Sequence, residues 1–203
     1  MKTGWFWLSV AGLTALATVR IVATFGDFSQ SFDEPYHIAA GMQWLEKGVY
    51  VFERLHPPLA RIAIALPLYL QGVRGHSQTS FPSINGKPVD VGIEMRNNGN
   101  QILASQGPDR YQHILFWARA GNLPFFWLSV WVLALWSRRW FGWKVALATV
   151  AIYTLLPQVL GNAGVATTDM AAAAGFLVAL YAFSCWIESP SLRSSAGLGA
   201  GVG

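Results

Sequence analysis

The sequence predicts an all-α fold: a polytopic membrane helix bundle with two juxtamembrane amphipathic helices in a large first external loop. The chain is 53% hydrophobic and only 12% charged, whereas soluble domains carry about 25% charged residues. Eight of its ten acidic residues fall within 27–109. This clustering predicts a large aqueous loop between membrane-embedded segments.

The first predicted span covers residues 5–26, close to the ~20 residues that cross a bilayer. Trp5 and Trp7 suit the aromatic belt at a membrane interface. A cleaved signal peptide, with residues 15–17 as its cleavage box, is the alternative. The apolar run continues past that box, which favours an uncleaved span. In both cases the residues that follow lie on the side away from the cytoplasm.

Residues 27–113 form the predicted external loop, and its first helix covers 33–47. Ile38, Met42 and Leu45 recur at helical spacing and share one face. A helix of this length is too short to cross the bilayer, so we expect it to lie in the plane of the membrane interface.

The second juxtamembrane helix is predicted over residues 57–73. Its length is about 25 Å, which is less than the ~30 Å of a hydrocarbon core. It also contains Arg61 and Pro67. If it spanned, the basic residues that follow the next span would face outward, against the positive-inside rule. We therefore expect it to lie half-buried on the extracytoplasmic surface.

The rest of the loop, residues 74–112, is polar. Asn85-Gly86 and Asn98-Gly99 are typical turn dipeptides, and Asn85-Gly86 would allow a small hairpin.

The later predicted spans cover 114–137, 145–164 and 170–187, and residues 196–203 resemble the start of another. The connector SRRWFGWK after the second span is basic, which places it and the N-terminus in the cytoplasm. Pro157 predicts a kink in the third span. The protein is thus expected to be multi-pass in the cell (inner or plasma) membrane.

Three acidic residues are candidates for chemistry: Asp33, Glu34 and Asp169. Adjacent carboxylates at a helix start can act as a general base and a positioning group. Capping of the helix explains one of them equally well. Asp169 stands between two apolar spans, where ionisable residues are functional candidates, although it can also cap the fourth span. On the predicted topology all three reach the extracytoplasmic face.

The candidates for binding a phosphate are His56, Arg61 and Arg119. A histidine near a carboxylate can carry a positive charge, but such residues at an interface also serve as polar anchors, and arginines there contact lipid headgroups. The histidines and acids would permit a metal site. No HxH, HxxxH or DxD spacing occurs, so we predict no cofactor and leave a divalent metal open.

Composition argues against a nucleic-acid partner. The net charge is only +4, and the basic residues form no stripe. The single Cys185 permits no internal disulfide.

Four segments in order resemble membrane glycosyltransferases of the C superfamily, closest to the protein O-mannosyltransferase and lipid A aminoarabinose transferase group. They are Asp33-Glu34 after the first span, HPPL at 56–59, ARAGNLPFFWLSVWVLALWSRRWFG at 118–142, and VATTDMAAA around Asp169. His56 matches the mannosyltransferase branch, since the aminoarabinose branch has lysine there. Residues 75–112 are longer than in the aminoarabinose branch.

The resemblance implies that residues 1–203 are the N-terminal part of one transmembrane glycosyltransferase domain, inactive alone. The implied reaction transfers a sugar with inversion from a polyprenyl-phosphate-linked donor to a hydroxyl of an acceptor protein or glycan. Asp33, Glu34 and Asp169 would be catalytic, with His56, Arg61 and Arg119 at the donor phosphate. The alternative is a non-enzymatic polyprenyl-phosphate-binding carrier or membrane complex subunit.

Overall fold

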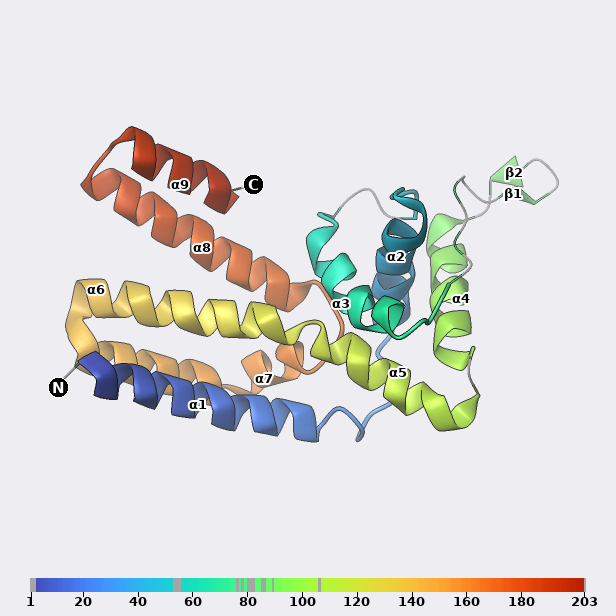
Figure 1. Cartoon of the computed structure of the whole chain (residues 1–203), viewed down its shortest axis with the longest axis horizontal. Coiled ribbons are helices and arrows are strands. Elements are labelled where there is room, and N and C mark those ends of the chain that lie inside the picture. The colour runs from blue at the N-terminus through green and yellow to red at the C-terminus, as the bar shows by residue number, and fades with distance from the viewer. Residues whose placement is uncertain are drawn as a thin grey trace. The chain divides into compact units, whose positions relative to one another are not determined.

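The computed structural model confirms the all-α prediction (Figure 1). It describes residues 3–52, 56–75, 77, 79, 83–84, 87–88, 90–105 and 107–202. The elements are α1 (Thr3–Ala23), α2 (Glu34–Lys47), α3 (Leu59–Leu70), β1 (Ser83–Ile84), β2 (Lys87–Pro88), α4 (Val91–Ala104), α5 (Pro108–Ala120), α6 (Leu123–Leu155), α7 (Pro157–Ala163), α8 (Asp169–Glu188) and α9 (Leu192–Val202).

The helices belong to two compact units. The first unit comprises Met1–Ile21, Pro124–Asn162 and Asp169–Gly203, and the second comprises Val22–Leu123 and Ala163–Thr168. In the described chain, three helical stretches are long and apolar enough to cross a membrane: Gly4–Ala23, Pro108–Leu155 and Asp169–Glu188. These stretches indicate a membrane protein.

In the first unit, α6 is two helices joined at Gly142, where the ribbon turns back on itself (Figure 1). Gly142 has φ 80° and ψ 174°, a conformation that residues with a Cβ rarely adopt. The Tyr153 hydroxyl donates to Ser129 Oγ at 2.9 Å and so joins the two halves. The stretch predicted as span 145–164 is interrupted at Leu156, and Pro157 then begins α7, close to the predicted kink.

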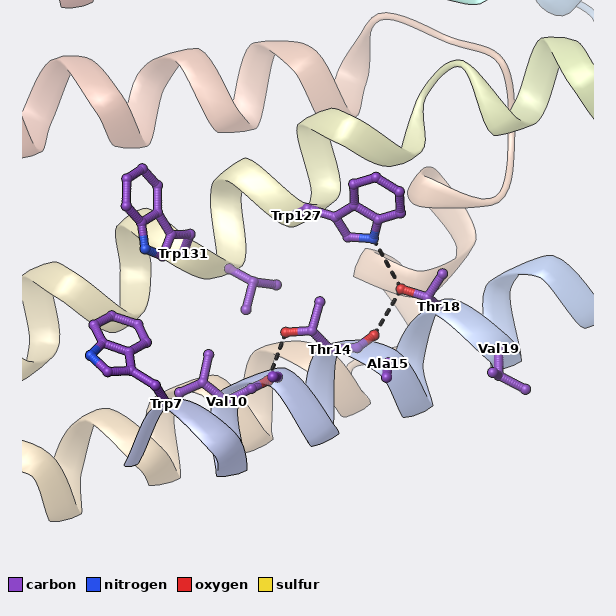
Figure 2. A pocket seen from close by; sticks show the side chains of 10 residues that line it. Trp7, Val10, Thr14, Ala15, Thr18, Val19, Trp127 and Trp131 are labelled. Carbon is purple, nitrogen blue, oxygen red and sulfur yellow. Dashed lines mark hydrogen bonds between the residues drawn. The ribbon is translucent and has the colours of Figure 1, made fainter. Parts of the chain in front are cut away.

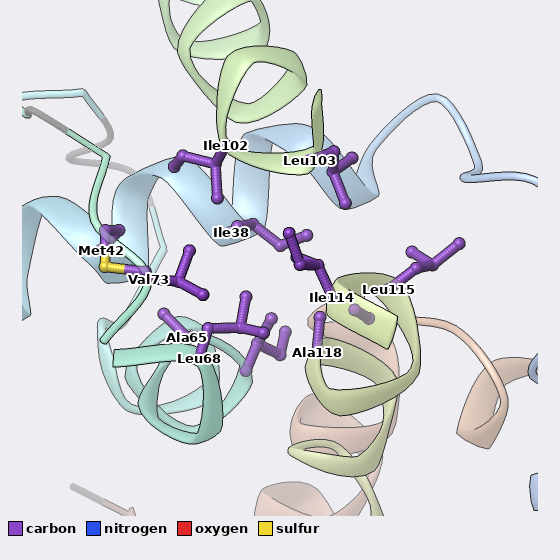
Figure 3. Close-up of a cluster of buried hydrophobic side chains, with 12 residues drawn as sticks. Ile38, Met42, Ala65, Leu68, Val73, Ile102, Leu103, Ile114, Leu115 and Ala118 are labelled. Atoms are coloured by element: carbon purple, nitrogen blue, oxygen red, sulfur yellow. The ribbon is translucent and has the colours of Figure 1, made fainter. Parts of the chain in front are cut away.

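The second unit is organised around α2, which packs against both α3 and α4, while α5 packs against α3. Figure 3 shows side chains from all four helices converging on one apolar cluster. Its fully buried members include Ile38 and Met42 of α2, Ile64 of α3, Ile102 of α4 and Leu115 of α5. Burial of such side chains stabilises a fold by about 1.5–3 kcal/mol each, so this cluster holds α2 in place.

The α2 and α3 boundaries agree closely with the predicted segments 33–47 and 57–73. The paired strands β1 and β2 flank Asn85-Gly86, as a hairpin there requires; those two residues lie outside the described chain. Asn98-Gly99 is not a turn, since both residues lie inside α4. A Cβ on Gly99 would overlap the backbone of Pro35, so this glycine permits close packing of α4 on α2. The predicted span 114–137 is divided between α5 and α6, with a break at Gly121.

Candidate functional site

Glu34, at the start of α2, is fully buried and accepts four hydrogen bonds in the second unit. Arg119 of α5 donates from Nε to Oε1 at 2.8 Å and from Nη2 to Oε2 at 3.0 Å. The backbone N–H of Ala166 donates to Oε1 at 2.8 Å, and that of Ser31 donates to Oε2 at 2.7 Å. This carboxylate therefore joins the start of α2 to α5 and to the segment before α8.

Every N–H donor of the Arg119 side chain makes a hydrogen bond. Beyond its two bonds to Glu34, it donates from Nη1 to the carbonyls of Phe25 and Phe28 at 2.6 and 3.2 Å, and from Nη2 to that of Ser29 at 3.1 Å. A guanidinium has five N–H donors, and these five bonds occupy all of them. Arg119 thus fixes the chain between α1 and α2.

Burial raises the pKa of Glu34, but the hydrogen bonds from Arg119, Ala166 and Ser31 outweigh it and hold that pKa below the ordinary value. Glu34 is therefore a carboxylate at neutral pH. A buried ion pair with every partner satisfied is a stable arrangement, whereas removal of one partner leaves a buried charge. The geometry shows that Glu34 holds the start of α2 in place.

Asp33 has the opposite environment. Its side chain is exposed, and although it occupies the N-cap position of α2 it makes no capping hydrogen bond. Within the described residues its carboxylate makes no hydrogen bond or ion pair. The capping interpretation of this residue therefore receives no support, and the carboxylate is exposed to solvent.

One turn along α2, His37 belongs to a second polar group that includes Arg61 of α3. Arg61 donates from Nε to His37 Nδ1 at 2.9 Å and from Nη1 to the Tyr50 hydroxyl at 3.1 Å. Its Nη2 lies 3.4 Å from Nδ1 of His56. Arg61 and His37 are 2% and 8% exposed, whereas His56 is exposed. The group thus leads from the protein interior to the surface.

Burial, followed by the positive charge of Arg61 and by His56, lowers the pKa of His37 to about 4, against a smaller opposing effect of Glu34. His37 is neutral at pH 7, which fits Nδ1 acting as an acceptor. Burial also lowers the pKa of Arg61, but a guanidinium remains charged in proteins. Arg61 is therefore a buried positive charge beside an exposed imidazole.

The structure brings Glu34 and Arg119 together and brings Arg61 close to His56. Asp169 opens α8 in the other unit with an exposed side chain. His37 and Tyr50 were not predicted as site residues. The signal for His37 was its position three residues after Glu34, on the face that α2 buries. Tyr50 gave no such signal. Among the described residues, no group of three His, Cys, Asp or Glu side chains could hold a metal ion.

Comparisons of this chain with protein-family models, with curated proteins and with solved structures found no match.

Proposed function

We propose that this protein is a glycosyltransferase of the cell (inner or plasma) membrane that uses a polyprenyl-phosphate-linked sugar donor. It would transfer the sugar, with inversion, to a hydroxyl of a protein or glycan acceptor at the extracytoplasmic face. The observation that carries the proposal is the exposed Asp33 carboxylate, which makes no capping hydrogen bond. It lies at the start of α2, one turn from the His37–Arg61 pair. The resemblance of four ordered segments to C-superfamily enzymes supports it.

Asp33 is the proposed general base. The acceptor oxygen attacks the anomeric carbon and Asp33 takes its proton, while the bond from that carbon to the phosphate oxygen breaks. The electron pair leaves with the polyprenyl phosphate. The growing negative charge needs a nearby cation, and Arg61 with the exposed His56 is our candidate.

The remaining predicted residues take supporting roles in this proposal. Arg119 has no donor left for a phosphate, because all five serve Glu34 and backbone carbonyls. We therefore assign Arg119 and Glu34 to holding the start of α2, and hence Asp33, in place. Asp169 would orient the acceptor from the second external loop.

The first prediction concerns Asp33→Asn in the intact protein. The amide cannot accept the acceptor's proton, so transfer should fall at least about a hundredfold, while expression and membrane insertion persist. The measurement is transfer of labelled sugar in membrane vesicles. Asp109→Asn is the matched control, because Asp109 is likewise an exposed acid near the start of a helix, α5, and it should retain activity. Turnover of Asp33→Asn at the wild-type rate would refute the assignment.

A non-enzymatic polyprenyl-phosphate carrier is the second candidate. It would use the same positive charge from Arg61 but would need no base. In that case Asp33→Asn would leave lipid binding and transport unchanged, and Arg61→Gln would abolish them.

A further inference from the structure

The first unit contains a groove that the proposed reaction does not use. It runs between α1 and the first half of α6 and has a volume of about 600 Å³. Its lining, drawn in Figure 2, is mostly apolar and carries no charged side chain: Trp7, Val10, Ala11, Thr14, Ala15, Thr18, Val19, Trp127, Val130 and Trp131. Ala11 and Ala15 give the groove its depth, since neither fills the space beside α1.

The polar groups along the body of the groove are satisfied within the protein. The Thr14 and Thr18 hydroxyls each donate at 2.8 Å to the backbone carbonyl four residues earlier. The Trp127 indole N–H donates to Thr18 Oγ1 at 3.0 Å, as Figure 2 shows. An occupant of this part therefore needs no hydrogen-bonding groups, which is the chemistry of a hydrocarbon chain.

The length of the groove fits one membrane leaflet. Trp7 and Val19 mark its ends along α1, and twelve residues of helix span about 18 Å. Half of a ~30 Å hydrocarbon core is about 15 Å. A fatty-acyl chain of one leaflet matches this length, whereas a long polyprenyl chain would extend beyond it.

The Trp7 end of the groove is polar and positively charged. Trp7 and Trp131 lie at this end in Figure 2, and within the described chain their indole N–H groups donate no hydrogen bond. The guanidinium carbon of Arg138 lies 5.8 Å from the centre of the Trp7 ring and 4.9 Å from that of Phe6. Trp7 is in the second turn of α1 and Arg138 precedes the Gly142 turn, so both lie near the ends of their helices.

From this arrangement we propose that the groove binds one acyl chain of an anionic phospholipid, with the headgroup phosphate at Arg138 and Trp7. The apolar body receives the chain, and the positive charge at its end selects the headgroup. Basic residues at helix ends attract anionic lipids by about a factor of five per residue. This site is independent of the proposed sugar transfer, because all its residues belong to the first unit.

The test uses the detergent-purified chain, incubated with dioleoyl phosphatidylglycerol or dioleoyl phosphatidylcholine, and native mass spectrometry to count retained lipids. The wild type should retain one phosphatidylglycerol in preference to phosphatidylcholine. Arg138→Gln should reduce that preference about fivefold. Arg139→Gln is its control, because Arg139 pairs with Glu188 at the surface and should keep the preference.

A second pair of variants tests the chain site. Ala15→Trp fills the groove and should abolish retention of both lipids, whereas Leu8→Trp, on an exposed position of α1 outside the lining, should not. Circular dichroism checks that each variant is helical. If Ala15→Trp does not fold, the comparison of Arg138→Gln with Arg139→Gln tests the proposal. Equal retention of the two lipids by the wild type would overturn the proposal. A dimer of the wild type that Ala15→Trp abolishes would also overturn it, since the groove would then hold a helix of a second copy of the chain.

Discussion

At the residue scale, the main feature of the second unit is the pair of polar groups on the first turns of α2. Glu34 accepts four hydrogen bonds and Arg119 donates five, so the hydrogen-bonding groups of this pair are satisfied within the protein. The His37–Arg61 pair differs, because its acceptor is a neutral imidazole. The hydrogen bond from Arg61 therefore requires His37 Nδ1 to be unprotonated.

This dependence predicts an acid-sensitive stability. His37 has a folded pKa of about 4 against 6.5 for the free side chain, so between these values the unfolded chain binds more protons than the folded one. The contribution of His37 to the free energy of unfolding is therefore fully present above pH 6.5. It falls by about 3 kcal/mol as the pH falls towards 4.

The measurement is thermal unfolding of the detergent-solubilised protein between pH 7 and pH 4. His37→Gln keeps an acceptor for Arg61 Nε but cannot be protonated, so its stability should fall less over this range than that of the wild type. Acid sensitivity of equal size in the two proteins would show that His37 is not its source. Glu34 and His56, the other titratable groups near His37, are unchanged in both proteins.

Only part of the site could be predicted from the sequence. The spacing of Ile38, Met42 and Leu45 predicted α2, and the acid pair marked its start. It could not be predicted that Glu34 is buried and Asp33 exposed. That difference depends on Arg119, 85 residues later, and on Ala166, 132 residues later. Sequence spacing carries no information on such distant contacts.

At the element scale, glycines determine how closely the helices of the second unit approach each other. A Cβ on Gly41 of α2 would overlap the backbone of Arg61, and a Cβ on Gly121 would overlap that of Ala63. With Gly99, these residues bring α2, α3, α4 and the end of α5 into backbone contact. The sequence did not predict α4, because Asn98-Gly99 has the composition of a turn. The close contact with the Pro35 backbone explains why a glycine stands inside this helix.

Gly41→Ala is therefore expected to destabilise the protein, although alanine favours a helix by about 1 kcal/mol over glycine. Overpacking costs about 1–3 kcal/mol, and here the overlapping atoms belong to backbone that cannot rotate away. Displacement of Arg61 should also weaken its bond to His37. Thermal unfolding of Gly41→Ala beside Gly12→Ala tests this, because a Cβ at Gly12 would meet nothing within 4 Å. A stability of Gly41→Ala equal to or above the wild type would contradict the packing.

At the scale of the whole molecule, the chain combines spanning-length helices with a compact helical unit that carries the candidate site. Hydropathy predicted the apolar stretches, because the loss of charged residues over ~20 positions is a strong signal. The turn at Gly142 falls within the predicted connector at 137–144. The break at Gly121 lies inside the predicted span 114–137 and depends on local backbone geometry, which hydropathy does not report.

The measurement that tests the central claim most directly is consumption of the donor. Membranes that contain the intact wild-type protein are incubated with a labelled polyprenyl-phosphate sugar and an acceptor extract, and the lipid fraction is followed over time. We predict that the label leaves the lipid and that free polyprenyl phosphate accumulates in equal amount, because the reaction breaks the sugar–phosphate bond. Donor that stays bound and intact, with no free polyprenyl phosphate formed, would contradict glycosyl transfer and favour a carrier.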